Sequence, residues 1–345
     1  MKLVAELMAL AGLAVAVAAA PPAYDWGDDT SELSQKLQES KALCRAVRTR
    51  EPPPADRPDA RTAAALKGCD SEALYYGIGI KADPIKARQC AFLERDAGDE
   101  GVMAGSTMLM TIYANGMGAK RDLDVATHLA CGIEGSVMES DGRVLHLAEL
   151  KAKKWSGSDF HFCDDITSGL AMGYCSAHSA RIDGAKRDAA LSAVIGRWSP
   201  AERQAFAKLQ QAQTAFVDAH GQGEVDLSGT ARAAMQIASE ERLKRDFLDT
   251  LQRLSSGKAP AFSTAQYRAA DTRLNAAYRK ALAGVEGEDF PGAVTRTGIR
   301  DAQRAWLRYR DAFLAFAKIK FPSLPSDSLA AWLTDKRTEM LETPE

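Results

Sequence analysis

Four side chains between positions 161 and 178 have the types and spacing that a zinc site requires. The stretch HFCDDITSGLAMGYCSAH carries His161 and Cys163 near its start and Cys175 and His178 at its end. Thiolate and imidazole groups are common ligands of tetrahedral zinc. A Ser-Gly pair between the two cysteines predicts a loop that would also allow them to meet. We favour a Cys163–Cys175 disulfide over a metal site, because the chain has the features of an exported protein.

Catalytic motifs are missing from the rest of the chain. None of the five histidines lies in an H-E-x-x-H arrangement, and the sequence has no G-x-S-x-G motif and no P-loop. Glu286 and Asp289 have the chemistry of a glycosidase carboxylate pair. Their surroundings, EGEDFP, instead predict an exposed loop with solvated carboxylates. We therefore expect a protein that is not an enzyme and needs no cofactor.

Two predicted helices near the C-terminus carry the candidate binding residues. These residues recur at helical spacing: Asp271, Asn275, Tyr278, Gln303, Trp306, Arg310 and Asp311. If the two helices pack as a hairpin, Asp271 and Arg310 come together in one polar network beside Trp306. One interpretation is a structural ion pair with Trp306 in the core. The other is a partly exposed site for a protein or saccharide, with Trp306 and Arg310 as anchors.

The N-terminus predicts export. Residues 1–20 place Lys2 ahead of an apolar run, from Leu7 to Ala20, that ends in small residues, which is the layout of a signal peptide. The run is shorter than the roughly 20 apolar residues that a spanning helix needs. We expect a periplasmic or secreted protein without a membrane span after cleavage.

Charge and cysteine usage agree with that compartment. The formal net charge is −2, so the chain has no general basic field and nucleic acid is a poor candidate partner. All six cysteines lie between Cys44 and Cys175. An even number of cysteines in an exported chain predicts disulfides. Because no cysteine follows Cys175, we expect the first half of the chain to carry the disulfides and the second half to have none.

A periodic section follows the first predicted helix. The pattern G-x-G-x-x-x-D occurs in residues 77–83 and again in residues 116–122, an offset of 39 residues that suits a helical solenoid. The glycines allow a tight turn and the aspartate can cap the next helix. The pattern resembles the Sel1-like repeat, although an unrelated array of hairpins would give similar spacing. Cys69 and Cys90 flank one such turn almost symmetrically, so we expect them to form a disulfide.

The remaining chain predicts helices separated by turn residues. Residues 203–216 align with 303–316 at an offset of 100, sharing apolar positions but not Arg310 and Asp311. We predict an all-α fold, with a short Sel1-like array followed by an antiparallel helical bundle. Its expected segments are a signal peptide (1–20), a leader and first helix (21–57), Sel1-like repeats (58–160), a cysteine loop (161–179), a degenerate hairpin (180–254) and a last helical domain (255–345).

Three motifs in the last domain carry a family resemblance. They are D-x-x-L-N-x-x-Y from Asp271, A-Q-x-x-W-L-x-Y-R-D from Ala302 and L-T-x-x-R-x-x-x-L from Leu333. In this order they resemble the LprI-like domain, a small exported helical domain named for lysozyme inhibition. This sequence lacks the cysteines that the family usually has after the R-D pair and before the L-T motif.

The resemblance implies a binding function in the bacterial envelope. The partner would be a protein, and the activity would be inhibition of a lysozyme-like or other cell-wall-degrading enzyme. An immunity protein against a secreted antibacterial effector and a structural envelope adaptor remain alternatives. Residues 255–345 contain 14 Lys and Arg against 11 Asp and Glu, a net charge of +3. This charge would not attract a basic lysozyme over long distances.

Overall fold

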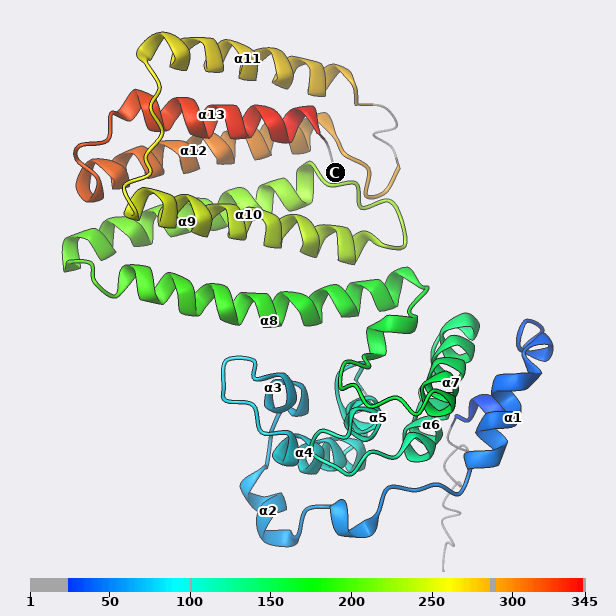
Figure 1. Ribbon diagram of the computed structural model, residues 1–345. Coiled ribbons are helices and arrows are strands. Elements are labelled where there is room, and N and C mark those ends of the chain that lie inside the picture. Colours follow the sequence, from blue (N-terminus) through cyan, green and yellow to red (C-terminus); the bar gives the residue numbers. More distant parts are fainter. Residues whose placement is uncertain (1–23, 100, 286–289, 344–345) are drawn as a thin grey trace, which may run out of the picture.

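The fold is all-α, as predicted. The computed structural model describes residues 24–99, 101–285 and 290–343, and every regular element within these ranges is a helix (Figure 1). The predicted signal peptide lies outside the described residues. Across the described ranges, no helix is both long and apolar enough to span a bilayer.

Short helices build the first lobe around one apolar core. Its elements are η1 (Trp26–Asp28), η2 (Ser34–Lys36), α1 (Gln38–Val47), η3 (Pro54–Asp56), α2 (Ala60–Ala65), α3 (Ser71–Tyr76), α4 (Pro84–Asp96), α5 (Gly105–Asn115), α6 (Leu123–Cys131), α7 (Val137–Ala152) and η4 (Phe162–Asp165). Consecutive helices pack against each other from α3 to α7. This is the arrangement expected of a hairpin array.

The turns of this array follow the predicted chemistry. Gly77 and Gly116 end α3 and α5 in the left-handed conformation, with φ of 73° and 65°. The side chains of Asp83 and Asp122 then cap α4 and α6 by accepting hydrogen bonds from backbone N–H groups. A Cβ atom at Gly118 would lie 2.2 Å from the carbonyl oxygen of residue 84, so this glycine lets the second turn touch the start of α4.

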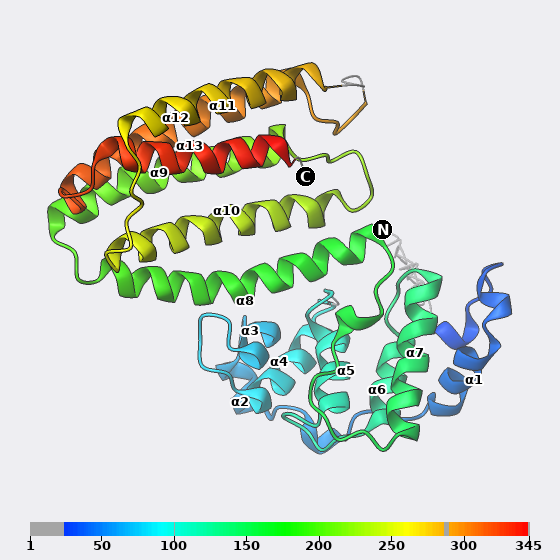
Figure 2. The same ribbon diagram turned by 45° about the horizontal axis from the view of Figure 1, so that its top comes forward.

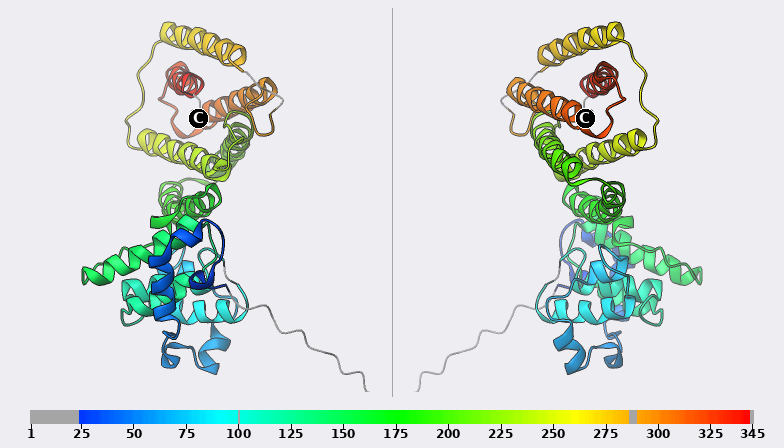
Figure 3. Two further views of the ribbon diagram at one scale, coloured as in Figure 1. Left: turned by 90° about the vertical axis from the view of Figure 1, so that its right-hand side faces the viewer. Right: turned by 90° about the vertical axis from the view of Figure 1, so that its left-hand side faces the viewer.

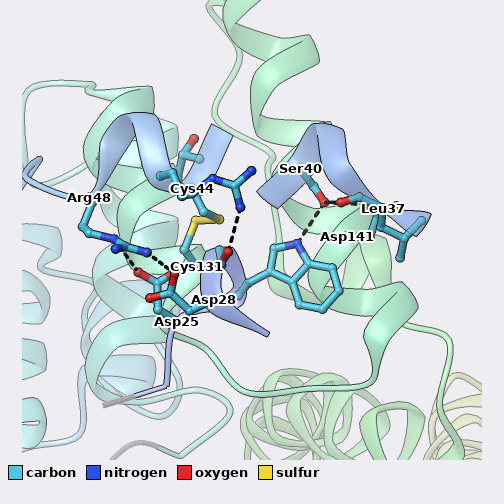
Figure 4. Close-up of a disulfide and its surroundings, with 12 residues drawn as sticks. Asp25, Asp28, Leu37, Ser40, Cys44, Arg48, Cys131 and Asp141 are labelled. Carbon is cyan, nitrogen blue, oxygen red and sulfur yellow. Dashed lines mark hydrogen bonds and ion pairs between the residues drawn. A yellow bond between two sulfur atoms is a disulfide. The ribbon is translucent and has the colours of Figure 1, made fainter. Parts of the chain in front are cut away.

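Two disulfides lie within the first lobe, and a third joins it to the long helix that follows. The structure pairs Cys69 with Cys90 and Cys163 with Cys175, as predicted, and Cys44 with Cys131. Figure 4 shows the Cys44–Cys131 bond, which joins α1 to α6 beside the ion pair of Arg48 with two aspartates. Its two cysteines are 87 residues apart in sequence, so the bond closes a loop that contains α2 to α5.

Six longer helices form the second lobe. They are α8 (Gly169–Ile195), α9 (Pro200–Gly223), α10 (Arg232–Ser255), α11 (Thr264–Ala283), α12 (Arg296–Lys320) and α13 (Ser326–Glu342). The main pairings are α8 with α10, α9 with α12 and α11 with α13. Figure 2 shows α8 beside α10. The second lobe thus consists of two three-helix units, α8 to α10 and α11 to α13, which are joined chiefly through the contact of α9 with α12.

The central pair runs antiparallel and uses the residues that the sequence alignment matched. Gly223 and Gly298 meet backbone to backbone at one end, and Lys320 pairs with Glu202 at 3.0 Å at the other. Phe216 and its counterpart Phe316 are both buried in the core between the two helices. Phe206 of α9 and Phe316 of α12, both in the matched segments, pack with their ring centroids 5.7 Å apart, so aromatic positions of the two copies contribute to the contact between the two units.

Helix α8 is the part of the second lobe that lies next to the first lobe (Figure 3). We expected the Ser-Gly pair before Cys175 to form a loop, and this was wrong. Ser168 instead caps α8 by accepting a hydrogen bond from the Ala171 N–H. Gly169 permits close packing, because a Cβ atom there would lie 2.3 Å from the backbone of Thr230. Cys175 is therefore a residue of α8, and it forms its disulfide with Cys163 from this helix.

Candidate functional site

The predicted binding residues do not converge on one network. On α11, Asn275 donates hydrogen bonds to the backbone oxygen and carboxylate of Asp271, at 2.8 and 3.1 Å, on the exposed face. Tyr278 is half-buried on the same helix. Neither polar residue reaches α12, because α11 packs against α13 instead. The predicted hairpin of α11 with α12 is therefore wrong.

On α12, the predicted residues divide between the core and the surface. Trp306 is only 2% exposed and belongs to the apolar core. The Arg310 guanidinium stacks over its ring at 5.3 Å and pairs with Asp311 at 2.9 Å. The predicted Arg310–Asp271 ion pair does not form. The burial of Trp306 agrees with the interpretation that placed it in the core, whereas Asp311 is exposed to solvent.

Gln303 belongs to a buried network that the sequence analysis missed. Arg337 of α13 donates to the Gln303 side chain at 2.9 Å and to both carboxylate oxygens of Glu224 at 2.5 and 2.7 Å. Arg337 is fully buried and Glu224 is 8% exposed. Two parallel hydrogen bonds to a carboxylate are the strongest arrangement open to an arginine. The network therefore connects α13 to both central helices.

A buried histidine continues the network. His220 lies one turn before Glu224 on α9, with 3.6 Å between its Nε2 and the carboxylate. Its Nδ1 forms a hydrogen bond with the Ser239 hydroxyl of α10 at 3.2 Å. Burial, followed by the charge of Arg337, lowers the pKa of His220 to about 3. The imidazole is therefore neutral, and Arg337 balances the charge of Glu224.

This network lies beneath a cavity of about 440 Å³. The C-terminal ends of α9, α11 and α13 and the N-terminal end of α12 surround it, at the right-hand end of the upper lobe in Figure 1. His220 and Glu224 face it from α9, and small apolar residues of α11 form one wall. A volume of this size is typical of sites for small ligands.

A second polar cluster lies where the lobes meet. The Cys163 N–H donates to His161 Nδ1 at 3.0 Å, so the proton of this imidazole is on Nε2. That nitrogen lies 3.0 Å from His178 Nε2, and His178 Nδ1 contacts Glu72 of α3. Arg181 pairs with the same glutamate. His161, His178 and Glu72 thus form a chain of hydrogen bonds between the first lobe and α8, in which the order of donors and acceptors is defined.

Both histidines of this chain are held neutral. Burial is the main cause that lowers the pKa of each, and for His161 the neighbouring imidazole adds to it while Asp164 opposes it. The cysteines of the considered zinc site are joined to each other. In the part of the chain that is described, no three His, Cys, Asp or Glu side chains are placed to hold a metal ion.

Comparison with known proteins defines the class of the last three helices. Residues 255–341 match the protein-family model described as Lysozyme inhibitor LprI. The match spans α11, α12 and α13 and contains the three motifs found in the sequence. No curated protein and no solved structure matches the chain. The C-terminal quarter is therefore an LprI-like domain, and it uses α9 as the packing partner of its central helix.

Proposed function

We propose that this protein is exported to the cell envelope and binds a lysozyme-like or other cell-wall-degrading enzyme through its LprI-like domain, thereby inhibiting it. The observation that carries the proposal is the family match over α11 to α13. The three disulfides are consistent with an extracytoplasmic location. The helical array would be Sel1-like and would hold or orient the inhibitory domain.

The outer face of α12 is the best candidate for the contact. Arg304, Leu307, Arg308 and Asp311 are all exposed and step by three and four, so they lie on one side of the helix. Leu307 is 37% exposed, which places an apolar side chain between two arginines. The face includes Asp311 from the predicted binding set, whereas Trp306 supports the helix from within.

This face suits a glycosidase cleft. Such enzymes place a pair of carboxylates on either side of the bond they cleave. Two arginines on a rigid helix would complement those carboxylates even where the enzyme as a whole is basic. The net charge of +3 in the last domain therefore argues against long-range attraction, but not against binding in the cleft.

A muramidase assay with the purified full-length chain tests the proposal. We expect cell-wall lysis by a sensitive enzyme to fall as the protein is titrated in. Arg308→Glu should weaken inhibition by roughly tenfold or more, because it places a carboxylate against the enzyme's own. Arg245→Glu, at an exposed position of α10, is the matched control and should inhibit normally.

Two other functions give different results in the same experiment. An immunity protein would bind a single antibacterial effector and leave general muramidases active, using the helical array as its docking surface. A structural adaptor would capture a partner from envelope extract without changing any activity. If no hydrolase is slowed at saturating protein, inhibition is refuted.

A further inference from the structure

A second cavity, of about 210 Å³, lies where α8, α9 and α10 meet. Its apolar lining comes from α8 and α10: Leu191, Phe247 and Leu248. The side chains that α9 contributes are all polar: Gln210, Gln213 and Thr214. The volume is below the roughly 300–1,000 Å³ of sites that enclose a drug-sized ligand, so the cavity fits one small group of a ligand.

Gln213 is the unusual member of this lining. Its side chain is 7% exposed, and within the described ranges its Nε2 has no hydrogen-bond partner. A buried amide without a partner destabilises the folded state. On its core side, beside Trp306 and Leu333, Gln213 borders a space of about 20 Å³, which is large enough for one water molecule. On its other side the amide borders the cavity, where a ligand is the alternative partner.

The second sequence copy has apolar residues at the same positions. In the alignment of residues 203–216 with 303–316, Gln213 corresponds to Phe313 and Thr214 to Leu314. Phe313 is fully buried in the core. An apolar side chain therefore suits this position of the helix, yet α9 carries an amide there. Polar groups at positions where packing favours an apolar residue are expected at functional sites.

Hydrogen bonding, rather than charge, distinguishes this site. Arg187 of α8 and Lys244 of α10 line the cavity, and both already pair with Glu241. The exposed carboxylate of Asp188 can accept hydrogen bonds from hydroxyl groups. The amide of Gln213 both donates and accepts, and so does an amide group of a ligand. The apolar lining suits the methyl group of an acetamide.

From these features we propose that the cavity binds the acetamido group of an N-acetylated amino sugar. The Gln213 amide pairs with the acetamido group, whose methyl contacts Leu191 and Phe247. The sugar hydroxyls bond to the exposed side chains of Gln210 and Thr214. The site belongs to the α8–α10 unit and uses no residue of the outer face of α12, so it goes beyond the proposed inhibition and does not depend on it.

Saturation-transfer NMR with the full-length protein and N-acetylglucosamine tests this proposal. We expect the strongest transfer at the acetyl methyl group, and a dissociation constant at least roughly fivefold lower than that of glucose, which lacks the acetamido group. An absence of transfer, or equal affinity for the two sugars, would overturn the proposal. The measurement contains no hydrolase, so its failure would leave the proposed inhibition untouched.

Matched variants on α9 locate the site. Gln213→Leu should lose transfer to the acetyl methyl group while its urea midpoint stays equal or rises, because the variant removes an unpaired buried amide. Gln211→Leu, at an exposed position outside the cavity, should bind normally. A lower midpoint for Gln213→Leu would show that the amide is structural and would contradict the assignment.

A second pair of variants tests the cavity without changing a buried residue. Thr214→Trp should fill the cavity and block binding, whereas Ala215→Trp, at an exposed position outside it, should not. Equal binding by these two variants would place the sugar elsewhere and refute the site.

Discussion

The buried pair of Arg337 and Glu224 is expected to be the most sensitive polar contact of the second lobe. Arg337→Met removes three hydrogen bonds and leaves the Glu224 carboxylate inside the protein, with the neutral His220 as its nearest partner. Breaking one side of a buried ion pair typically costs about 3–5 kcal/mol. For a unit of this size, that corresponds to a fall in Tm of roughly 6–20 °C.

Arg310→Met is the matched control for this substitution. It makes the same chemical change on the neighbouring helix, at a pair whose aspartate is 65% exposed. A pair of this kind, together with stacking on Trp306, should contribute about 1 kcal/mol or less. Urea denaturation of both variants, monitored by far-ultraviolet circular dichroism, gives the comparison. If Arg310→Met is as damaging as Arg337→Met, the distinction between buried and surface pairs drawn here is refuted.

Two further measurements separate the ion pair from simple loss of volume. Glu224→Gln together with Arg337→Met removes both charges and should recover roughly half of the lost stability or more. The deficit of the single variant should shrink as the pH falls from 7.5 to 5.5. A buried carboxylate without its cation has a raised pKa and takes up a proton more readily. A constant deficit over this range would mean that the charge on Glu224 is not the cause.

The other predictions concern smaller features. Burial lowers the pKa of His161 and His178, so the stability that they contribute is present above the unfolded-state pKa near 6.5. As the pH falls below that value, this stability is lost, by up to about 1.4 kcal/mol per pH unit for each histidine. The pH dependence of the urea midpoint measures the loss. Gly223→Ala should cost about 1–3 kcal/mol, since its Cβ atom would lie 2.6 Å from the α12 backbone, whereas Gly221→Ala meets only side-chain atoms and should be tolerated in the same titration. Ser239→Ala should cost about 1 kcal/mol by removing a buried hydrogen bond, and a larger loss in thermal unfolding would point to a wider rearrangement.

Helices and local turns were predictable because their causes are local. The helical spacing of Gln303, Trp306 and Arg310 predicted a helix, and these residues lie in α12. Glycine followed by a capping aspartate predicted the turns of the array. The Cys69–Cys90 bond followed from its near symmetry about one such turn. Each of these features depends on residues close together in the chain.

Helix pairing was not predictable in the same way. An apolar stripe shows that one face of a helix is buried, but it does not say which helix covers it. The D-x-x-L-N motif therefore suggested a contact between α11 and α12, whereas Leu274 faces a core to which α13 contributes. Arg337 was part of a quoted motif, yet arginine is usually exposed, and Glu224 lies 113 residues away. The spacing of Arg337 at four residues from both Leu333 and Leu341, which places it on the apolar face of the helix, was the signal that could have identified it.

The pairing of α9 with α12 has a consequence for fragments of this protein. A fragment that starts at residue 255 would keep all of the family-matching segment but lose Phe206 of α9 and Phe247 of α10, which pack against Phe316 and Phe313, two of the largest fully buried side chains. The exposed stripe would be self-complementary, because the matched positions of α9 are those of α12. Such a fragment should therefore associate as a two-fold dimer, with a second α12 in the place of α9.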